Sequence, residues 1–134
     1  MKYAINTLII FLSLISMSSQ CKKDMDCRTK LINNTDETLW YDISCIVPSD
    51  SLAWEGNCMA AKVGANSSKE ICSNETWEER FSRMITDTII VWITNADTAE
   101  KYNMFEIIEG NKYYRKEILS QDDLIKMNYI ISYP

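Results

Sequence analysis

Residues 88–94 have the sequence TIIVWIT, which is the most strand-like stretch of the chain. β-Branched and aromatic residues of this kind favour extended backbone. The apolar side chains occupy both odd and even positions, so both faces of a strand here would be apolar. A strand with two apolar faces is typical of the centre of a sheet that is covered on both sides. We therefore expect residues 88–94 to form a central strand, with the rest of the fold built around it.

Residues 39–46, with the sequence LWYDISCI, alternate instead. Leu39, Tyr41, Ile43 and Cys45 fall on one face, and the residues between them, beginning with Trp40, fall on the other. This period of two predicts a strand with one buried face. A loop is expected over residues 50–57. Weaker patterns predict further strands at residues 29–32, 59–63, 68–73, 112–119 and 128–133.

Two short helices are expected between the later strands. Asp97, with Glu100 three residues on, has the spacing of a capping box, and Gly110 stands where a left-handed residue would end that helix. Ser120 caps the second helix. One or two further helical turns are predicted at residues 74–84, where aromatic and apolar residues recur at helical spacing.

Six or seven strands with one or two short inserted helices predict a mainly β protein. The expected fold is a single β-sandwich, immunoglobulin-like or related. A length of 134 residues suits one domain. We expect residues 28–134 to form the sandwich, residues 21–27 to be a tether, and residues 1–20 to be a signal peptide that is removed.

The N-terminal segment has the plan of a secretory signal. Lys2 supplies a positive start, residues 4–17 are mainly apolar, and small residues precede Cys21. This predicts a lipoprotein in which Cys21 becomes the lipid-modified first residue, held to a bilayer by its acyl chains. Gln20 departs from the usual small residue before the lipidated cysteine. The alternative is ordinary cleavage near Ser18 or Ser19.

Cysteine parity favours lipidation of Cys21. The chain has five cysteines, and an exported protein rarely leaves one thiol unpaired. Lipidation leaves an even set of four, in a compartment that permits disulfides. The four are Cys27, Cys45, Cys58 and Cys72.

Strand positions suggest how these four cysteines pair. A hairpin folded about residue 36 would place Cys27 opposite Cys45, at a separation that suits a disulfide. A turn at residues 64–66 would do the same for Cys58 and Cys72. We therefore predict Cys27–Cys45 and Cys58–Cys72 bridges. The rival is a four-cysteine zinc site, but the chain has no C-x-x-C pair, and we expect no metal.

Composition excludes several functions. Lys and Arg number 14 against 19 Asp and Glu, so the net charge is −5. An acidic chain does not attract phosphate backbones, and we expect no nucleic-acid partner. Histidine is absent, which removes the commonest general base and metal ligand. The acidic pairs at residues 78–79 and 122–123 point their carboxylates apart and do not converge on a substrate. We expect neither an enzyme nor a cofactor.

Binding of a ligand or partner is a better hypothesis for this chain than catalysis. Trp40 lies on the face opposite the expected core, and Trp54 and Trp77 lie in or near predicted loops. Aromatic side chains at such places stack on sugars or anchor protein partners. These three tryptophans are therefore the candidate ligand contacts, with a glycan or an envelope protein as the partner. An inhibitor or immunity-type protein is the alternative.

Two segments carry a resemblance to a known group. They are NNTDETLWY at residues 33–41 and the C-terminal part with LSQDDL at 119–124 and NYIISYP at 128–134. Together they resemble small uncharacterised lipoproteins of Bacteroides and its relatives. The resemblance implies an outer-membrane address in the cell envelope, on the periplasmic or the surface face, with a palmitate-type lipid anchor. It implies no activity.

The same resemblance implies a modification. Bacteroides O-glycosylation resembles the rule of Asp, then Ser or Thr, then a small or apolar residue. Ser51, Thr88 and Thr98 match this rule. They are the candidate O-glycosylation sites, although Asp-Ser and Asp-Thr also occur simply as turn and cap residues.

Overall fold

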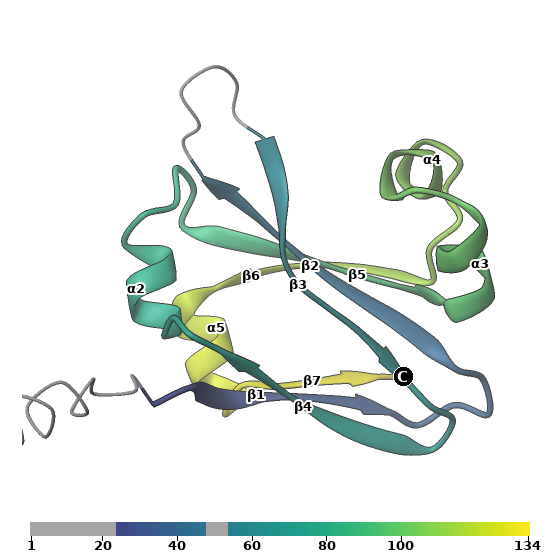
Figure 1. The fold of residues 1–134 in the computed structure, drawn as a ribbon, viewed down its shortest axis with the longest axis horizontal. Helices are drawn as coiled ribbons and strands as arrows, with labels where there is room; N and C mark the ends of the chain where they lie inside the picture. Colours follow the sequence, from purple (N-terminus) through teal and green to yellow (C-terminus); the bar gives the residue numbers. More distant parts are fainter. Residues whose placement is uncertain (1–23, 48–53) are drawn as a thin grey trace, which may run out of the picture.

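The computed structural model describes residues 24–47 and 54–134, and they form a β-sandwich (Figure 1). A three-stranded sheet, here sheet A, has the order β4-β1-β7, and a four-stranded sheet, sheet B, has the order β3-β2-β5-β6. The strands of sheet A are β1 (Asp26–Asn33), β4 (Ser67–Ser73) and β7 (Ile130–Tyr133). Those of sheet B are β2 (Leu39–Val47), β3 (Trp54–Val63), β5 (Thr88–Asn95) and β6 (Arg115–Ser120).

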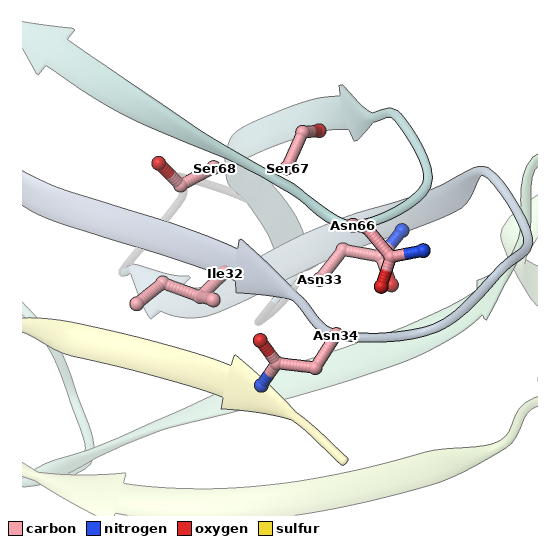
Figure 2. Close-up of a pocket in the computed structure, with 6 residues that line it drawn as sticks. All are labelled: Ile32, Asn33, Asn34, Asn66, Ser67 and Ser68. Atoms are coloured by element: carbon pink, nitrogen blue, oxygen red, sulfur yellow. The ribbon is translucent and has the colours of Figure 1, made fainter.

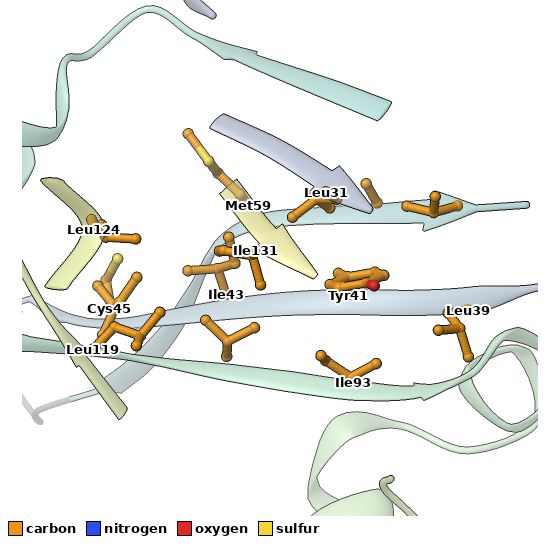
Figure 3. Close-up of a cluster of buried hydrophobic side chains, with 14 of the residues drawn as sticks. Leu31, Leu39, Tyr41, Ile43, Cys45, Met59, Ile93, Leu119, Leu124 and Ile131 are labelled. Carbon is orange, nitrogen blue, oxygen red and sulfur yellow. The ribbon is translucent and has the colours of Figure 1, made fainter. Parts of the chain in front are cut away.

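The central position of β5 and the alternation of β2 are confirmed. β5 pairs with β2 on one side and β6 on the other. Leu39, Tyr41 and Ile43 of β2 are fully buried, and the Tyr41 hydroxyl donates to the carbonyl of Ile32 at 2.7 Å. Figure 3 shows Tyr41 and Ile43 on the side of β2 where Leu31 and Ile131 of sheet A lie, and all of these residues belong to one core cluster. The core therefore lies between the sheets.

Four short helices connect the strands within the described residues, more than the one or two expected. They are α2 (Trp77–Phe81), α3 (Ala96–Lys101), α4 (Met104–Glu109) and α5 (Gln121–Lys126). The single helix predicted after Asp97 is divided, because Asn103 forms a new capping box with Glu106 and starts α4. Asn95, not Asp97, caps α3.

The end of α4 also differs from the prediction. Gly110 is the C-cap residue with φ −84°, and Asn111, at φ 48°, takes the left-handed conformation. Asparagine tolerates this region better than most residues. By contrast, the predicted cap at Ser120 is confirmed: its hydroxyl accepts from the Asp123 N–H, and the Asp123 carboxylate accepts from the Ser120 N–H.

The expected hairpins at residues 36 and 64–66 do not form. β1 belongs to sheet A and β2 to sheet B, so the chain crosses between the sheets at residues 34–38. It crosses back between β3 and β4. Strand β1 pairs instead with β4 and, in parallel, with β7. Alternation along a strand shows which face is buried, but not which strand lies beside it.

The predicted disulfide pairing is therefore wrong. Cys27 bonds to Cys72 and Cys45 bonds to Cys58. Each bridge joins neighbouring strands of one sheet, β1 with β4 in sheet A and β2 with β3 in sheet B. The predicted partners Cys27 and Cys45 lie in different sheets, about 10 Å apart in packed sandwiches, too far for a bridge.

Several boundaries shift. β1 begins at Asp26, so the predicted tether of residues 21–27 overlaps the sandwich by two residues. β3 already begins at Trp54, inside the predicted loop. β7 begins only at Ile130, because Asn128 and Tyr129 have positive φ values. In the described part of the chain, no helix has the length and apolar character needed to span a bilayer. The predicted signal peptide lies outside the described residues.

Candidate functional site

The three candidate tryptophans have different environments. Trp77 is 2% exposed, and its Nε1 donates to the Thr29 hydroxyl at 2.7 Å, so the prediction that it contacts a ligand is wrong. Its spacing with Phe81 reflects core packing. The backbone of Trp54 begins β3, and its side chain lies outside the described residues. Trp40 is half-buried on the outer face of sheet B.

The predicted modification sites are scattered. Thr88 is half-buried at the start of β5, opposite Ser120. Thr98 is half-buried in α3, where its carbonyl accepts from the Tyr102 N–H. Ser51 and Cys21 lie outside the described residues. The structure brings none of the described modification sites to Trp40.

A row of four side chains crosses the outer face of sheet B beside Trp40. Strand register places Ala60 of β3, Asp42 of β2, Trp92 of β5 and Lys116 of β6 side by side. We call these four residues the Asp42 row. They lie on the outer face because the neighbours of Ala60, Asp42 and Trp92 in their strands fill the core, and Lys116 is paired with Trp92. Acidic, aromatic and basic groups thus meet on one surface.

Asp42 is buried although it lies on an outer face. Its residue is 2% exposed, and its carboxylate accepts a hydrogen bond from the Ser44 hydroxyl at 3.3 Å. Burial raises the pKa of Asp42 above its usual range, while hydrogen bonds from Ser44 and the Trp40 side chain act in the opposite direction. A carboxylate shielded in this way interacts strongly with any donor that reaches it.

Aromatic residues cover the middle of the row. Trp92 is 3% exposed, and Tyr113 packs edge-on against it with ring centroids 4.8 Å apart. The Lys116 Nζ lies 4.8 Å from the Trp92 ring centre, a cation–π geometry. Trp92 Nε1 is buried and has no hydrogen-bond partner among the described residues. Such an orphaned donor is rare in native proteins.

Ser44 donates to a carboxylate, and the chain has no histidine to serve as a base for its hydroxyl. Within the described ranges, no three His, Cys, Asp or Glu side chains gather to hold a metal. Asp42 and Trp92 are buried, so the groups of this face that a ligand can touch are the half-buried Trp40 indole and the exposed Lys116 ammonium.

Other hollows lie among the described residues. One, of about 330 Å³, is lined by Ile32 and by uncharged polar residues near the end of β7, among them Asn34, Asn66 and Ser68 (Figure 2). Another, of about 410 Å³, lies between α2 and α5 and carries the carboxylate of Glu78. Arg28 holds the pKa of Glu78 at about 2 through two short hydrogen bonds. That carboxylate therefore has a structural partner.

Comparison with known proteins identifies no relative. No family model matches the chain, and neither a curated protein nor a solved structure is similar to it.

Sequence reasoning named Trp40 on this face but did not name the residues that surround it. Asp42 and Ser44 were already placed on the Trp40 face by the alternation of β2, and a carboxylate on that face was the available signal. Trp92 and Lys116 join them only through the register of β5 and β6. That register depends on tertiary packing and has no local signal.

Burial of Asp42 leads to a prediction about pH. We expect Asp42→Asn to increase the free energy of unfolding near neutral pH and to have little effect below about pH 4. The folded-state pKa is raised, so ionisation of Asp42 opposes folding as pH rises, and both states are protonated in acid. Asparagine retains an acceptor oxygen for Ser44 and Trp40.

Urea unfolding of both proteins at the two pH values measures the effect. Asp87→Asn, at an exposed carboxylate, is the matched control and should change stability little. A loss of stability in Asp42→Asn at both pH values would contradict the prediction, because it would show that the carboxylate is held by interactions stronger than its burial cost.

Proposed function

We propose that this protein is an exported, lipid-anchored component of the cell envelope that binds a partner without catalysis. Cys21 carries the lipid, in an outer-membrane lipoprotein, and the outer face of sheet B carries the binding surface. The lipid anchor attaches the protein to the membrane.

The cysteine pairing carries this proposal. Two disulfides use Cys27, Cys45, Cys58 and Cys72, every cysteine except Cys21. Disulfides are typical of oxidising compartments outside the cytosol. The remaining cysteine follows the apolar N-terminal segment directly, at the position where a lipoprotein is modified.

The binding surface is supported by the Asp42 row with Trp40. Trp40 is half-buried and Lys116 is exposed on this face, whereas Asp42 and Trp92 are buried. Sugars stack on aromatic faces such as that of Trp40, and their hydroxyl groups accept hydrogen bonds from an ammonium group. A glycan of the envelope is therefore the first partner class.

An inhibitor or immunity-type protein is the second candidate, and Ile118 favours it. Ile118 lies on the same outer face of β6, opposite Ile90, and is 60% exposed. An exposed apolar side chain beside aromatic residues is common at the centre of protein interfaces. A glycan array and a pull-down from envelope extracts, each repeated with Trp40→Ala, separate the two classes.

Lipid attachment is tested with Cys21→Ala in the native host. We expect the wild-type protein to fractionate with membranes, to incorporate a labelled fatty acid and to begin at residue 21. The variant should lose the label and leave the membrane fraction, because acyl burial supplies the attachment. Intact-mass analysis with and without reductant measures the acyl chains and both bridges together.

The four bridged cysteines provide the control, since the variant should retain both disulfides. A wild-type protein that keeps Met1, or whose Cys21 is unmodified, would contradict the lipid anchor. Free thiols at all four other positions would contradict export.

A further inference from the structure

The two disulfides lie in very different environments. Cys45 is fully buried in the core cluster, and Cys58 is partly buried against it. Cys27 and Cys72 are both exposed. Exposure decides whether an attacking thiolate can reach a sulfur along the S–S axis, so the two bridges differ in access to a reductant.

The exposed bridge also lies at the margin of sheet A. The β1–β4 register shifts between Asp26 and Thr29, so Cys27 belongs to a bulge that Cys72 faces. β4 is an edge strand. Figure 1 shows this bulged end of β1 where the chain enters the sandwich. The bridge therefore links the first residues of β1 to the edge strand β4 of sheet A.

Other interactions hold the same elements together. Beyond the bulge, β1 and β4 pair continuously from Thr29–Ile71 to Asn33–Ser67. At the entrance, the Arg28 guanidinium contacts the Asp26 and Glu78 carboxylates at 2.7 and 2.6 Å. It also lies 4.5 Å from the Tyr129 ring centre. The sandwich thus has contacts at this end that do not depend on the bridge.

We propose that Cys27–Cys72 is a redox-exchange site that a dithiol reductant opens in the folded protein, whereas Cys45–Cys58 is a permanent structural bridge. One thiolate of the dithiol attacks a sulfur of the exposed pair, forming a mixed disulfide, and the other cysteine leaves as a thiolate that solvent protonates. The second thiol of the reductant, as its thiolate, then attacks the reductant sulfur of the mixed disulfide, and the bound cysteine leaves as a thiolate that solvent protonates. The dithiol is oxidised to its disulfide, and Cys27 and Cys72 are reduced to two thiols.

Opening the bridge has a local consequence. It removes the covalent link between β4 and the first residues of β1, while the β1–β4 ladder and the core remain. The two thiols then stand at the surface, close to where the chain enters the sandwich. The exchange does not require a lipid on Cys21, so the redox proposal does not depend on the proposed lipid anchor.

The test uses the oxidised full-length chain with dithiothreitol and no denaturant. Samples are quenched with iodoacetamide at intervals and mapped by peptide mass spectrometry. We expect Cys27 and Cys72 to be alkylated at least about tenfold faster than Cys45 and Cys58, because a buried bridge reacts only from opened states. Circular dichroism should show that the strands persist while only the exposed pair is reduced.

The double variant Cys27→Ser/Cys72→Ser is the matched control and should lack the fast phase while retaining the second bridge. Equal rates for both bridges, or a fast phase that tracks global unfolding, would overturn the proposal. Failure of the double variant to fold would overturn it too, because that result would make the exposed bridge a structural requirement.

Discussion

Trp77→Ala is expected to lower the free energy of unfolding by about 3–5 kcal/mol, the cost of deleting a large buried aromatic side chain. Trp77 is 2% exposed and packs against Phe81 with ring centroids 5.9 Å apart. Its Nε1 donates to the buried Thr29 hydroxyl, so α2 is fastened to β1 of sheet A. Removing the indole leaves a cavity and an unpaired hydroxyl in the same place.

Chemical denaturation measures the decrease in the free energy of unfolding. Two milder variants separate the contribution of the hydrogen bond from that of ring packing. Trp77→Phe keeps most of the ring but removes the N–H, and Thr29→Val removes the acceptor. We expect each to cost about 1–2 kcal/mol and the double variant to cost less than their sum, because both delete one hydrogen bond. A Trp77→Ala effect below about 1 kcal/mol would contradict the assignment of Trp77 to the core.

The second large effect is expected at Asn33, which lies at the crossing from sheet A to sheet B. Asn33 is fully buried. Its amide nitrogen donates to the carbonyls of Glu37, Val63 and Gly64, at 2.7, 3.2 and 2.9 Å. Its amide oxygen accepts from the backbone N–H and hydroxyl of Thr35. One side chain thus joins both crossings of the chain between the sheets.

Asn33→Asp is therefore expected to cost about 3 kcal/mol or more near neutral pH. It changes almost no volume, but it removes the donor from three carbonyl oxygens and places a carboxylate beside them. Such burial raises the pKa of the new carboxyl group, so the loss should grow as pH rises above about 4 and shrink in acid.

Urea unfolding across this pH range measures the effect, with Asn34→Asp as the matched control. Asn34 is the next residue in the chain and is exposed, so its substitution should change stability by less than about 0.5 kcal/mol. Similar losses in the two variants would show that the crossing does not depend on the Asn33 amide.

Local patterns were enough for part of the secondary structure. The apolar stretch at residues 88–94 became a central strand, and the alternation that begins at Leu39 separated a buried face from the face that carries Trp40. The Ser120 cap was readable as well, because its two reciprocal hydrogen bonds involve only residues three apart. These features depend only on residues that are close together in the sequence, so they can be predicted from it.

The wrong predictions for the disulfides and for Trp77 concern contacts between distant residues. Pairing Cys27 with Cys45 assumed that a turn signal makes a hairpin, but the same turn residues serve a crossing between sheets when the Asn33 amide binds the carbonyls of both crossings. Trp77 was predicted to lie near a loop. Its spacing with Phe81 did not reveal that its Nε1 donates a hydrogen bond to the Thr29 hydroxyl, which lies far away in the sequence.

Composition and periodicity determined that this chain forms strands, which face of β2 is buried, and that a two-layer β fold follows, since these depend on the chemistry of each side chain and its near neighbours. Tertiary structure alone decided which strands are adjacent, which cysteines bond, and that Trp92 lies between Asp42 and Lys116. Those outcomes depend on register and sheet membership, which are chosen by the packing of the whole core and have no signal in any short segment.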